Sequence, residues 1–259
     1  MRQYLFLLQR ILEEGEDVQD RTKTGTRRLF AERLEFDLTK GFPIVTTKKV
    51  AFHAVATELA WFLRGDTNIA YLHRHNVHIW DAWADEEGNL GPIYGAQWRS
   101  WDGKIDQLRD VVEEMKVNPS SRRFVVSSWN VGAMAEMKLP PCHILFQFYI
   151  SQDQRLSLQV YQRSADIFLG IPFNISSYAL LAHLVARQLG LGVGRLVFSL
   201  GDVHLYHNHI EQARIQLPRE PFSLPELCLK KGDVFDFSPE DAILRGYKHH
   251  PVLRGEVAV

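Results

Sequence analysis

The chain has 259 residues, of which 46% are hydrophobic and 24% are charged, with a net charge of -1 at pH 7. This composition is ordinary for a folded globular protein, and the near-neutral charge argues against a general nucleic-acid or anionic-membrane surface. Two cysteines exclude a disulfide scaffold and favour a reducing cytoplasm, and the amphipathic N-terminal segment is typical of neither a signal peptide nor a membrane span.

Hydrophobic periodicity predicts helices and strands that are mixed along the chain without a regular βαβ repeat. The predicted helices are Tyr4–Glu14, Ala51–Leu63, Ile105–Val117 and Ile175–Leu189, and the predicted strands are 34–38, Phe124–Ser127, His143–Ile150, Arg155–Gln162 and Leu196–Ser199. The sequence contains no internal repeat, low-complexity tract or convincing linker. We therefore predict a single domain, residues 1–259, of the α+β class, with a mixed β-sheet packed by helices.

The helix predicted over Ala51–Leu63 carries one carboxylate, Glu58, in an otherwise apolar run. Helical spacing places Glu58 on the same face as Val55, Leu59 and Phe62. A buried carboxylate costs free energy unless it has partners, and desolvation raises its pKa. A carboxyl group tuned in this way suits proton transfer. The alternative is a structural glutamate bonded to a neighbouring backbone group or tryptophan.

Several conspicuous features have ordinary structural explanations when they are taken alone. The aromatic density of Ile79–Trp101 usually indicates core. Arg21, in a loop rich in Gly and Thr, is typical of a solvated charge, and the pair Arg122-Arg123 is typical of a solvated face. Cys228 lies in an alternating strand without a flanking basic cluster, which predicts a buried filler.

The segment Leu139–Asn174 contains two alternating apolar runs separated by the turn sequence SQDQ, a pattern that predicts an antiparallel hairpin. Placing Ile150 opposite Arg155 also places Cys142 opposite Arg163 at the open end. A guanidinium beside a thiol stabilises the thiolate, which is the nucleophilic form. The alternative is that this cysteine is a small buried hydrophobic residue.

Asn174 has two interpretations that the residues alone leave open. It immediately precedes the apolar run Ile175–Leu189, and asparagine is a favoured helix N-cap because its side chain accepts hydrogen bonds from the first backbone amides. Alternatively, its amide reads the edge of a nucleic-acid base, because it carries both a donor and an acceptor.

The histidines of the chain do not predict a metal site. His204 and His207 would share a face if GDVHLYHNH were helical, but no cysteine or carboxylate follows at a matching spacing, and the H-E-x-x-H pattern is absent. His73, His75 and His78 are interpreted as surface residues. We therefore predict that the protein uses no metal.

The order and length of several motifs resemble the thymidylate synthase family over nearly the whole chain. The motifs are DRTKTGT (Asp20–Thr26), GFPIVTTKK (Gly41–Lys49), ELAWFLRGDTNIAYL (Glu58–Leu72), IWDAWADEEGNLGPIYGAQWR (Ile79–Arg99), NPSSRRFVVSSWNVG (Asn118–Gly132), PPCH, YQRSADIFLGIPFN and GDVHLYHNH. The resemblance implies a thymidylate synthase-like fold. It also implies a methyltransferase that converts deoxyuridine monophosphate (dUMP) to thymidylate (dTMP), with 5,10-methylenetetrahydrofolate as the donor of one carbon and a hydride.

The resemblance assigns catalytic roles to individual residues. The Cys142 thiolate would add to C6 of uracil, with Tyr94 near the later proton abstraction and Glu58 organising water near the folate. Arg163 would hold phosphate and favour the thiolate, and Asn174 would pair with uracil. The catalytic residues implied in this way are Cys142, Glu58, Tyr94, Arg163, Asp166 and Asn174.

The resemblance also implies binding sites for both substrates. The residues implied for dUMP are Arg21, Arg122, Arg123, Arg163, Ser164, Ala165, Asp166, Asn174, His204 and Tyr206, and those implied for the reduced folate are Trp80, Trp83, Asp166, Gly170, Phe173 and Ala258. Arg122 and Arg123 would reach the nucleotide phosphate of the other subunit, which implies an obligate homodimer. His204 and Tyr206 would bind the deoxyribose hydroxyl, and the C-terminal tail would fold over the folate.

Two functional alternatives belong to other classes. An aspartate in place of Asn174 would mark a deoxycytidylate hydroxymethylase, so the asparagine favours uracil. A non-catalytic nucleotide- or RNA-binding homologue is the second alternative, and the near-neutral charge gives it no support. Ala51, where some members have a folate-contacting histidine, and Lys248-His249, in place of Asp-Pro, depart from the family pattern without touching the catalytic set.

Overall fold

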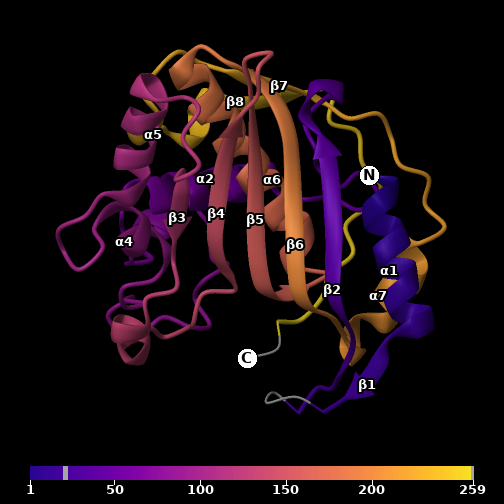
Figure 1. The fold of residues 1–259 in the computed structure, drawn as a ribbon. Helices are drawn as coiled ribbons and strands as arrows, with labels where there is room; N and C mark the ends of the chain where they lie inside the picture. Colours follow the sequence, from indigo (N-terminus) through magenta and orange to yellow (C-terminus); the bar gives the residue numbers. More distant parts are fainter. Residues whose placement is uncertain (20–22, 258–259) are drawn as a thin grey trace.

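The computed structural model describes residues 1–19 and 23–257, which form a six-stranded mixed sheet packed on helices and a separate two-stranded sheet (Figure 1). The strands are β1 (Glu16–Val18), β2 (Thr26–Asp37), β3 (Val125–Ser127), β4 (His143–Ile150), β5 (Arg155–Asp166), β6 (Gly192–Tyr206), β7 (Glu226–Leu229) and β8 (Ala242–Arg245). The large sheet has the order β1-β2-β6-β5-β4-β3, and β7 pairs with β8. Because β5 and β6 are parallel and the other pairs are antiparallel, the predicted α+β class is confirmed.

The helices pack mainly on one face of the large sheet. They are α1 (Arg2–Glu14), α2 (Phe52–Leu63), α3 (Ala70–Arg74), α4 (Tyr94–Arg99), α5 (Gln107–Val117), α6 (Gly170–Leu189) and α7 (Ile210–Gln216). Helix α6 supplies the crossover that the parallel pair β5 and β6 requires, and it lies with α2 behind the sheet in Figure 1. Both helices are apolar on most sides, so they form the centre of the core. Within the described residues, no helix has the length and apolar character needed to cross a membrane.

Most predicted elements are present, but their boundaries differ. Helix α6 begins at Gly170, so Asn174 lies inside its second turn and is not the N-cap that one interpretation required. Strand β6 extends from Gly192 through Tyr206, so His204 lies on a strand and the helical face considered for it does not exist. Cys228 is half-buried on β7, whereas the pattern predicted full burial.

The β4–β5 hairpin is present, but the register predicted for most of its length is wrong. Ile150 lies opposite Leu156 and not opposite Arg155, and the same shift of one position continues along the paired strands. The alternation itself is correct, because Phe146 and Phe148 are both 1% exposed and face the helices. This shift decides which side chains face each other: the observed register sets Phe146 opposite Val160 and Phe148 opposite Leu158, whereas the predicted register would have set them opposite Gln159 and Ser157. Apolar alternation therefore favours the observed register, and the prediction was wrong because it fixed the pairing at the turn.

A β-bulge at the open end of this hairpin restores the predicted pairing at the candidate nucleophile. The register changes between His143 and Leu145, so that His143 pairs with Gln162. The backbone N–H of Arg163 then donates to the carbonyl of Cys142 at 2.8 Å. The predicted juxtaposition of Cys142 with Arg163 is confirmed, although it depends on a bulge that the sequence pattern did not indicate.

Large apolar side chains are exposed on the sheet face opposite α2 and α6, and these two helices lie behind the sheet in Figure 1. The exposed side chains are Phe30 (79% exposed), Tyr149 (61%), Val125 (40%) and Tyr161 (37%), from four different strands. Alternation places them on the face opposite the buried residues that pack on α2 and α6. Large exposed apolar side chains gathered on one face of a sheet are typical of a protein interface.

Candidate active site

Cys142 and Arg163 lie side by side where β4 begins. The Arg163 guanidinium donates from Nε to the carbonyl of Pro141 and from Nη2 to the carbonyl of Pro140, both at 2.9 Å. It also lies over the Trp129 ring, with its Cζ 5.4 Å from the ring centroid. These contacts hold a permanent positive charge against the segment that leads into the cysteine, because the two prolines contribute carbonyls without competing N–H donors.

Burial and charge act in opposite directions on the Cys142 thiol. Burial raises its pKa above the ordinary value, and it outweighs the opposing effects of the Arg163 charge and of hydrogen bonds from Ser164 and Tyr94. The thiol is therefore the resting form at neutral pH. Arg163 does favour the thiolate, as predicted, and it limits the cost of forming one.

Glu58 and Tyr94 are joined to the cysteine by buried contacts. The Trp80 indole N–H donates to Glu58 Oε1 at 2.7 Å, and the Cys142 backbone N–H donates to Tyr94 Oη at 2.7 Å. The Trp80 and Tyr94 rings pack with centroids 6.0 Å apart. Burial raises the pKa of Glu58 to about 7 and raises the pKa of Tyr94 well above its usual range. Glu58 thus has both features that the sequence analysis considered, a hydrogen bond from a tryptophan and a carboxyl group whose pKa burial raises.

His143 and Tyr178 belong to this cluster although the sequence analysis assigned no role to either. The His143 ring stacks on Tyr94 with centroids 4.1 Å apart, and its Nδ1 is 2.6 Å from Tyr178 Oη. Burial lowers the pKa of His143 to about 3, so the ring is neutral. Its position immediately after Cys142 was the available signal.

A chain of amides orients Asn174. Gln162 Nε2 donates to the backbone carbonyl of Ser164 at 3.0 Å, and Gln162 Oε1 accepts from Asn174 Nδ2 at 3.2 Å. Gln162 is buried, whereas Asn174 and its neighbour Phe173 are partly accessible within a helix that is otherwise mostly buried. The sequence analysis missed Gln162, because nothing in a strand pattern indicates which amide a buried glutamine contacts.

Asp166 closes the end of β5 next to β6. Its Oδ1 accepts from the backbone N–H groups of Phe168 at 2.8 Å and Leu169 at 3.0 Å, which anchors the turn into α6. On the neighbouring parallel strand, His204 pairs with Asp166, and its Nδ1 is 3.1 Å from Asp202 Oδ1. The predicted binding residues Asp166 and His204 are therefore adjacent at the same end of these two central strands.

The remaining predicted residues divide into three groups. The first group consists of residues that lie next to the side chains described above: Trp83, Ser164, Ala165, Gly170, Phe173 and Tyr206. Arg122 and Arg123 are exposed just before β3 and are separated from Cys142. Arg21 and Ala258 lie outside the described residues.

The C-terminal tail is held close to this end of β5 and β6. The Glu256 carbonyl accepts from Asn208 Nδ2 at 3.4 Å and lies 2.9 Å from His209 Nε2. His250 N donates to the Thr46 carbonyl at 2.8 Å. The described part of the tail is therefore attached to the segment that follows β6, beside the predicted folate residues of the β5–α6 turn.

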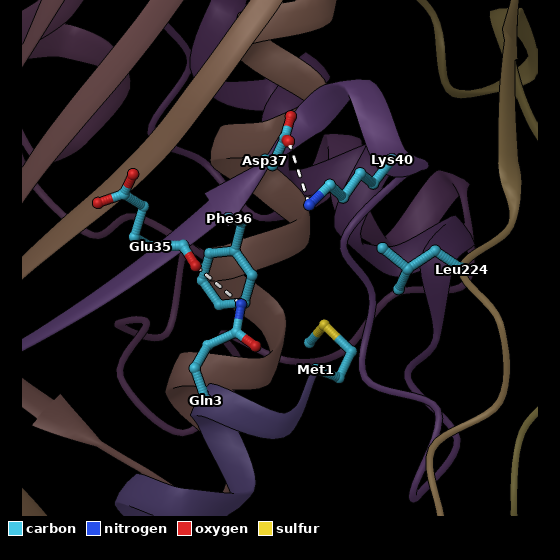
Figure 2. A pocket seen from close by; sticks show the side chains of 7 residues that line it. All are labelled: Met1, Gln3, Glu35, Phe36, Asp37, Lys40 and Leu224. Carbon is cyan, nitrogen blue, oxygen red and sulfur yellow. Dashed lines mark hydrogen bonds and ion pairs between the residues drawn. The ribbon is translucent and has the colours of Figure 1, made fainter.

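Two surface hollows differ in their relation to these residues. One, of about 510 Å³, opens on the apolar sheet face and is lined by Arg163, Arg28 and Tyr161 among others. The other, of about 390 Å³, lies between the start of α1 and the end of β2 (Figure 2). There Gln3 donates to the Glu35 carbonyl at 2.8 Å, and Lys40 pairs with Asp37 at 3.7 Å. Of the predicted site residues that the structure describes, none lines this second hollow.

Gly201 allows β6 to approach the backbone of Arg163. A Cβ at this position would lie 2.9 Å from the Arg163 carbonyl oxygen, and backbone cannot move aside as a flexible side chain can. We predict that Gly201→Ala lowers stability by about 1–3 kcal/mol and also lowers kcat/KM, because β5 must shift at Arg163. Denaturant unfolding and steady-state kinetics would measure both effects. Gly232→Ala is the matched control, since its Cβ would meet nothing within 4 Å; equal stability of the two variants would contradict the prediction.

The fold and the clustered cysteine, arginine, carboxyl and amide groups define an enzyme with a candidate cysteine nucleophile on a mixed sheet. The thymidylate synthase family model matches residues 2–259. The chain therefore belongs to the thymidylate synthase family, a family of methyltransferases, as the sequence motifs indicated.

Proposed function

We propose that the protein catalyses the reductive methylation of dUMP to dTMP with 5,10-methylenetetrahydrofolate, through a covalent bond between Cys142 and uracil. The observation that carries this proposal is the pairing of Cys142 with Arg163 in a chain of this family. A free cysteine nucleophile needs a reducing compartment, so we include a cytoplasmic location in the proposal. Neither alternative class is favoured by a specific contact in the described residues.

The amide chain supports uracil as the base. Because Gln162 Oε1 accepts one N–H of Asn174, the Asn174 side chain keeps one further N–H and its carbonyl oxygen for a ligand. Uracil offers N3–H as a donor beside O4 as an acceptor, and these match the remaining amide groups. Cytosine offers an acceptor and a donor in the reverse order. Gln162 therefore supports specificity by fixing which way the Asn174 amide faces.

The chemical step begins at the Cys142 sulfur. Its thiolate adds to C6 of uracil, the ring electrons move toward C5 and O4, and C5 becomes the nucleophile that accepts the one-carbon unit. Burial raises the pKa of the thiol, and the Arg163 charge opposes this effect. Proton transfer from the thiol therefore accompanies or precedes attack, and Arg163 lowers its cost whether or not it also holds the phosphate.

Glu58 and Tyr94 are the proposed proton-handling groups. A carboxyl with a pKa of about 7 exchanges protons readily at neutral pH, and Glu58 is oriented by the Trp80 indole. Tyr94 is held at the Cys142 backbone and keeps its proton, because burial raises its pKa well above the usual range. We assign Tyr94 to orienting the water that accepts the proton from C5, and Glu58 to organising the water around it.

The residues proposed for the folate fit an aromatic ligand with a polar edge. Trp80 and Trp83 pack with centroids 5.6 Å apart, and Trp83 and Phe173 are both partly accessible. Asp166 contributes a carboxylate at the β5–α6 turn, whose Oδ1 is engaged by backbone amides. When bound, the reduced folate supplies the one-carbon unit and the hydride. The chain would orient it and, through the tail, exclude water from the reacting atoms.

The positions of Arg122 and Arg123 support a homodimer. The Phe148 backbone N–H donates to the Phe124 carbonyl, so these arginines lie level with the turn end of β4, whereas Cys142 lies at its other end. Six residues of strand separate these levels by about 20 Å, which is beyond the reach of an arginine side chain. Both arginines can serve a site that contains Arg163 only if they come from a second copy, and the apolar sheet face beside that site offers the interface.

The test of the proposed function is dihydrofolate formation by purified protein supplied with methylenetetrahydrofolate and either dUMP or dCMP. Turnover with dUMP alone is the expected result. Hydroxymethylation of dCMP without folate oxidation would move the assignment to the hydroxymethylase class. A folded protein that binds nucleotide or RNA but turns over neither substrate would be a binding homologue, and the proposal would fail.

Replacing Glu58 with glutamine should change both activity and the pH dependence of stability. Burial raises the pKa of Glu58 from 4.5 to about 7, so the folded state holds this proton more tightly than the unfolded state. The folding stability that this difference in pKa contributes is fully present below pH 4.5 and is lost as the pH rises through 7, a change of about 3 kcal/mol. Glu58→Gln should lack this loss, and its turnover should fall by about 100-fold or more. Unfolding free energies at pH 5 and pH 8 test the first effect, and parallel pH profiles for both proteins would contradict it.

A further inference from the structure

Three exposed side chains outside the proposed active site converge where α3 ends: His73 lies in its last turn, and His78 and Asp81 lie in the loop that follows it. His73 Nε2 is 2.7 Å from Asp81 Oδ1, and His78 Nδ1 is 2.9 Å from Asp81 Oδ2. The two imidazole rings have centroids 4.7 Å apart. Among residues 1–19 and 23–257, this is the group of His, Cys, Asp and Glu side chains whose donor atoms all lie within 4.8 Å of one another. The sequence analysis treated both histidines as unconnected surface residues.

The loop holds these donors in place through its backbone and its buried residues. Asn76 N donates to the His73 carbonyl at 2.9 Å, and Val77 N donates to the Leu72 carbonyl at 3.0 Å. Asn76 has a positive φ of 56°, a conformation that asparagine tolerates, and it reverses the chain between the two histidines. Leu72, Val77 and Trp80 are buried beneath the loop. The donors therefore come from a short segment whose backbone is already fixed.

The geometry suits a small divalent transition metal. Bond lengths of about 2.0–2.2 Å from zinc to imidazole nitrogen and carboxylate oxygen place tetrahedral donors roughly 3.3 Å apart. The present separations to Asp81 are slightly shorter, so rotation of exposed side chains is sufficient to admit an ion. Two imidazoles with one carboxylate favour zinc, cobalt or nickel over magnesium or calcium, which prefer all-oxygen sites. Side-chain exposures of 42%, 56% and 44% leave the remaining coordination positions to water.

We propose that His73, His78 and Asp81 form a surface site for one divalent transition metal of the zinc class, which clamps this loop. Asp81 directly follows Trp80, whose indole donates to Glu58 at 2.7 Å. A metal bound to Asp81 would therefore restrain the loop that carries Trp80, the hydrogen-bond partner of Glu58. This assignment does not rest on the proposed methyltransferase reaction, because each donor lies outside the set of residues given to it.

The test is a titration of the purified metal-free protein with Co²⁺, followed by its visible absorption and by competition with Zn²⁺. The expected result is saturation at one ion per chain, with visible bands of a four- or five-coordinate site that Zn²⁺ abolishes. His73→Ala and Asp81→Asn should each weaken binding at least 10-fold. Zn²⁺ should also raise the Tm of the unaltered protein, because it binds the folded loop, and should raise the Tm of these variants much less.

His53→Ala is the matched control, since His53 is an exposed histidine on the neighbouring helix α2 and lies 3.0 Å from the His75 carbonyl. It should bind Co²⁺ as the unaltered protein does. Circular dichroism of the metal-free variants shows that each is folded. The proposal is overturned if binding survives in both His73→Ala and Asp81→Asn, if His53→Ala abolishes it, or if no saturable absorption develops at millimolar Co²⁺.

Discussion

Replacing Cys142 with serine should reduce turnover of dUMP on the order of 10³-fold or more, while nucleotide binding is retained. A serine hydroxyl occupies nearly the same space, but at neutral pH it provides far less of the anionic nucleophile than a thiol does. Arg163 and the amide chain from Ser164 through Gln162 to Asn174 would remain in place. Steady-state kinetics would measure the loss, and calorimetry with dUMP would measure binding.

Cys228→Ser is the control for this substitution. Both cysteines are free and half-buried, but Cys228 lies on β7, in the separate two-stranded sheet. Its serine variant should keep near-normal turnover. In addition, unaltered protein treated with dUMP and a folate analogue should yield a covalent adduct by mass spectrometry, and Cys142→Ser should not. Substantial turnover by Cys142→Ser would remove the nucleophile from the proposed mechanism.

Mixing two inactive variants should restore activity if each site borrows Arg122 and Arg123 from a partner subunit. The double variant Arg122→Ala/Arg123→Ala should bind the dUMP phosphate poorly, and Cys142→Ala lacks the nucleophile. In a mixed dimer, one site combines an intact cysteine with intact partner arginines, while the other site lacks both. Random exchange at equal concentrations should therefore recover about a quarter of the unaltered activity.

The outcome of the mixing experiment depends on exchange between subunits, so the mixture is denatured and refolded together. Each variant refolded alone is the control and should stay inactive. Light scattering should give a dimer for all samples, because the exposed aromatic residues Phe30, Tyr149 and Tyr161 are unchanged. Recovery no greater than the sum of the separate variants, from a dimeric mixture, would show that the arginines do not act across subunits. A monomer in every sample would contradict the proposed interface.

The sequence predicted much of the candidate site because its patterns are local. Pairing the two apolar runs from their turn placed Cys142 near Arg163, and the apolar helix around Glu58 predicted a buried carboxyl group with a raised pKa, which the structure has at about 7. The same patterns left the Asn174 interpretations open, because N-caps and base-reading amides use the same residue type. The start of α6 at Gly170 removes the cap, and the bond to Gln162 aims the amide.

What the sequence by itself determined is the family, the mixed α+β fold and most secondary-structure elements, since apolar periodicity and long motifs are properties of neighbouring residues. Only the tertiary structure revealed the bulge that brings Cys142 back opposite Arg163 at the open end of the hairpin. It also decided that burial outweighs Arg163 in setting the Cys142 pKa, and that His73 meets Asp81. These outcomes depend on desolvation and on contacts between separate chain segments, which no local pattern encodes.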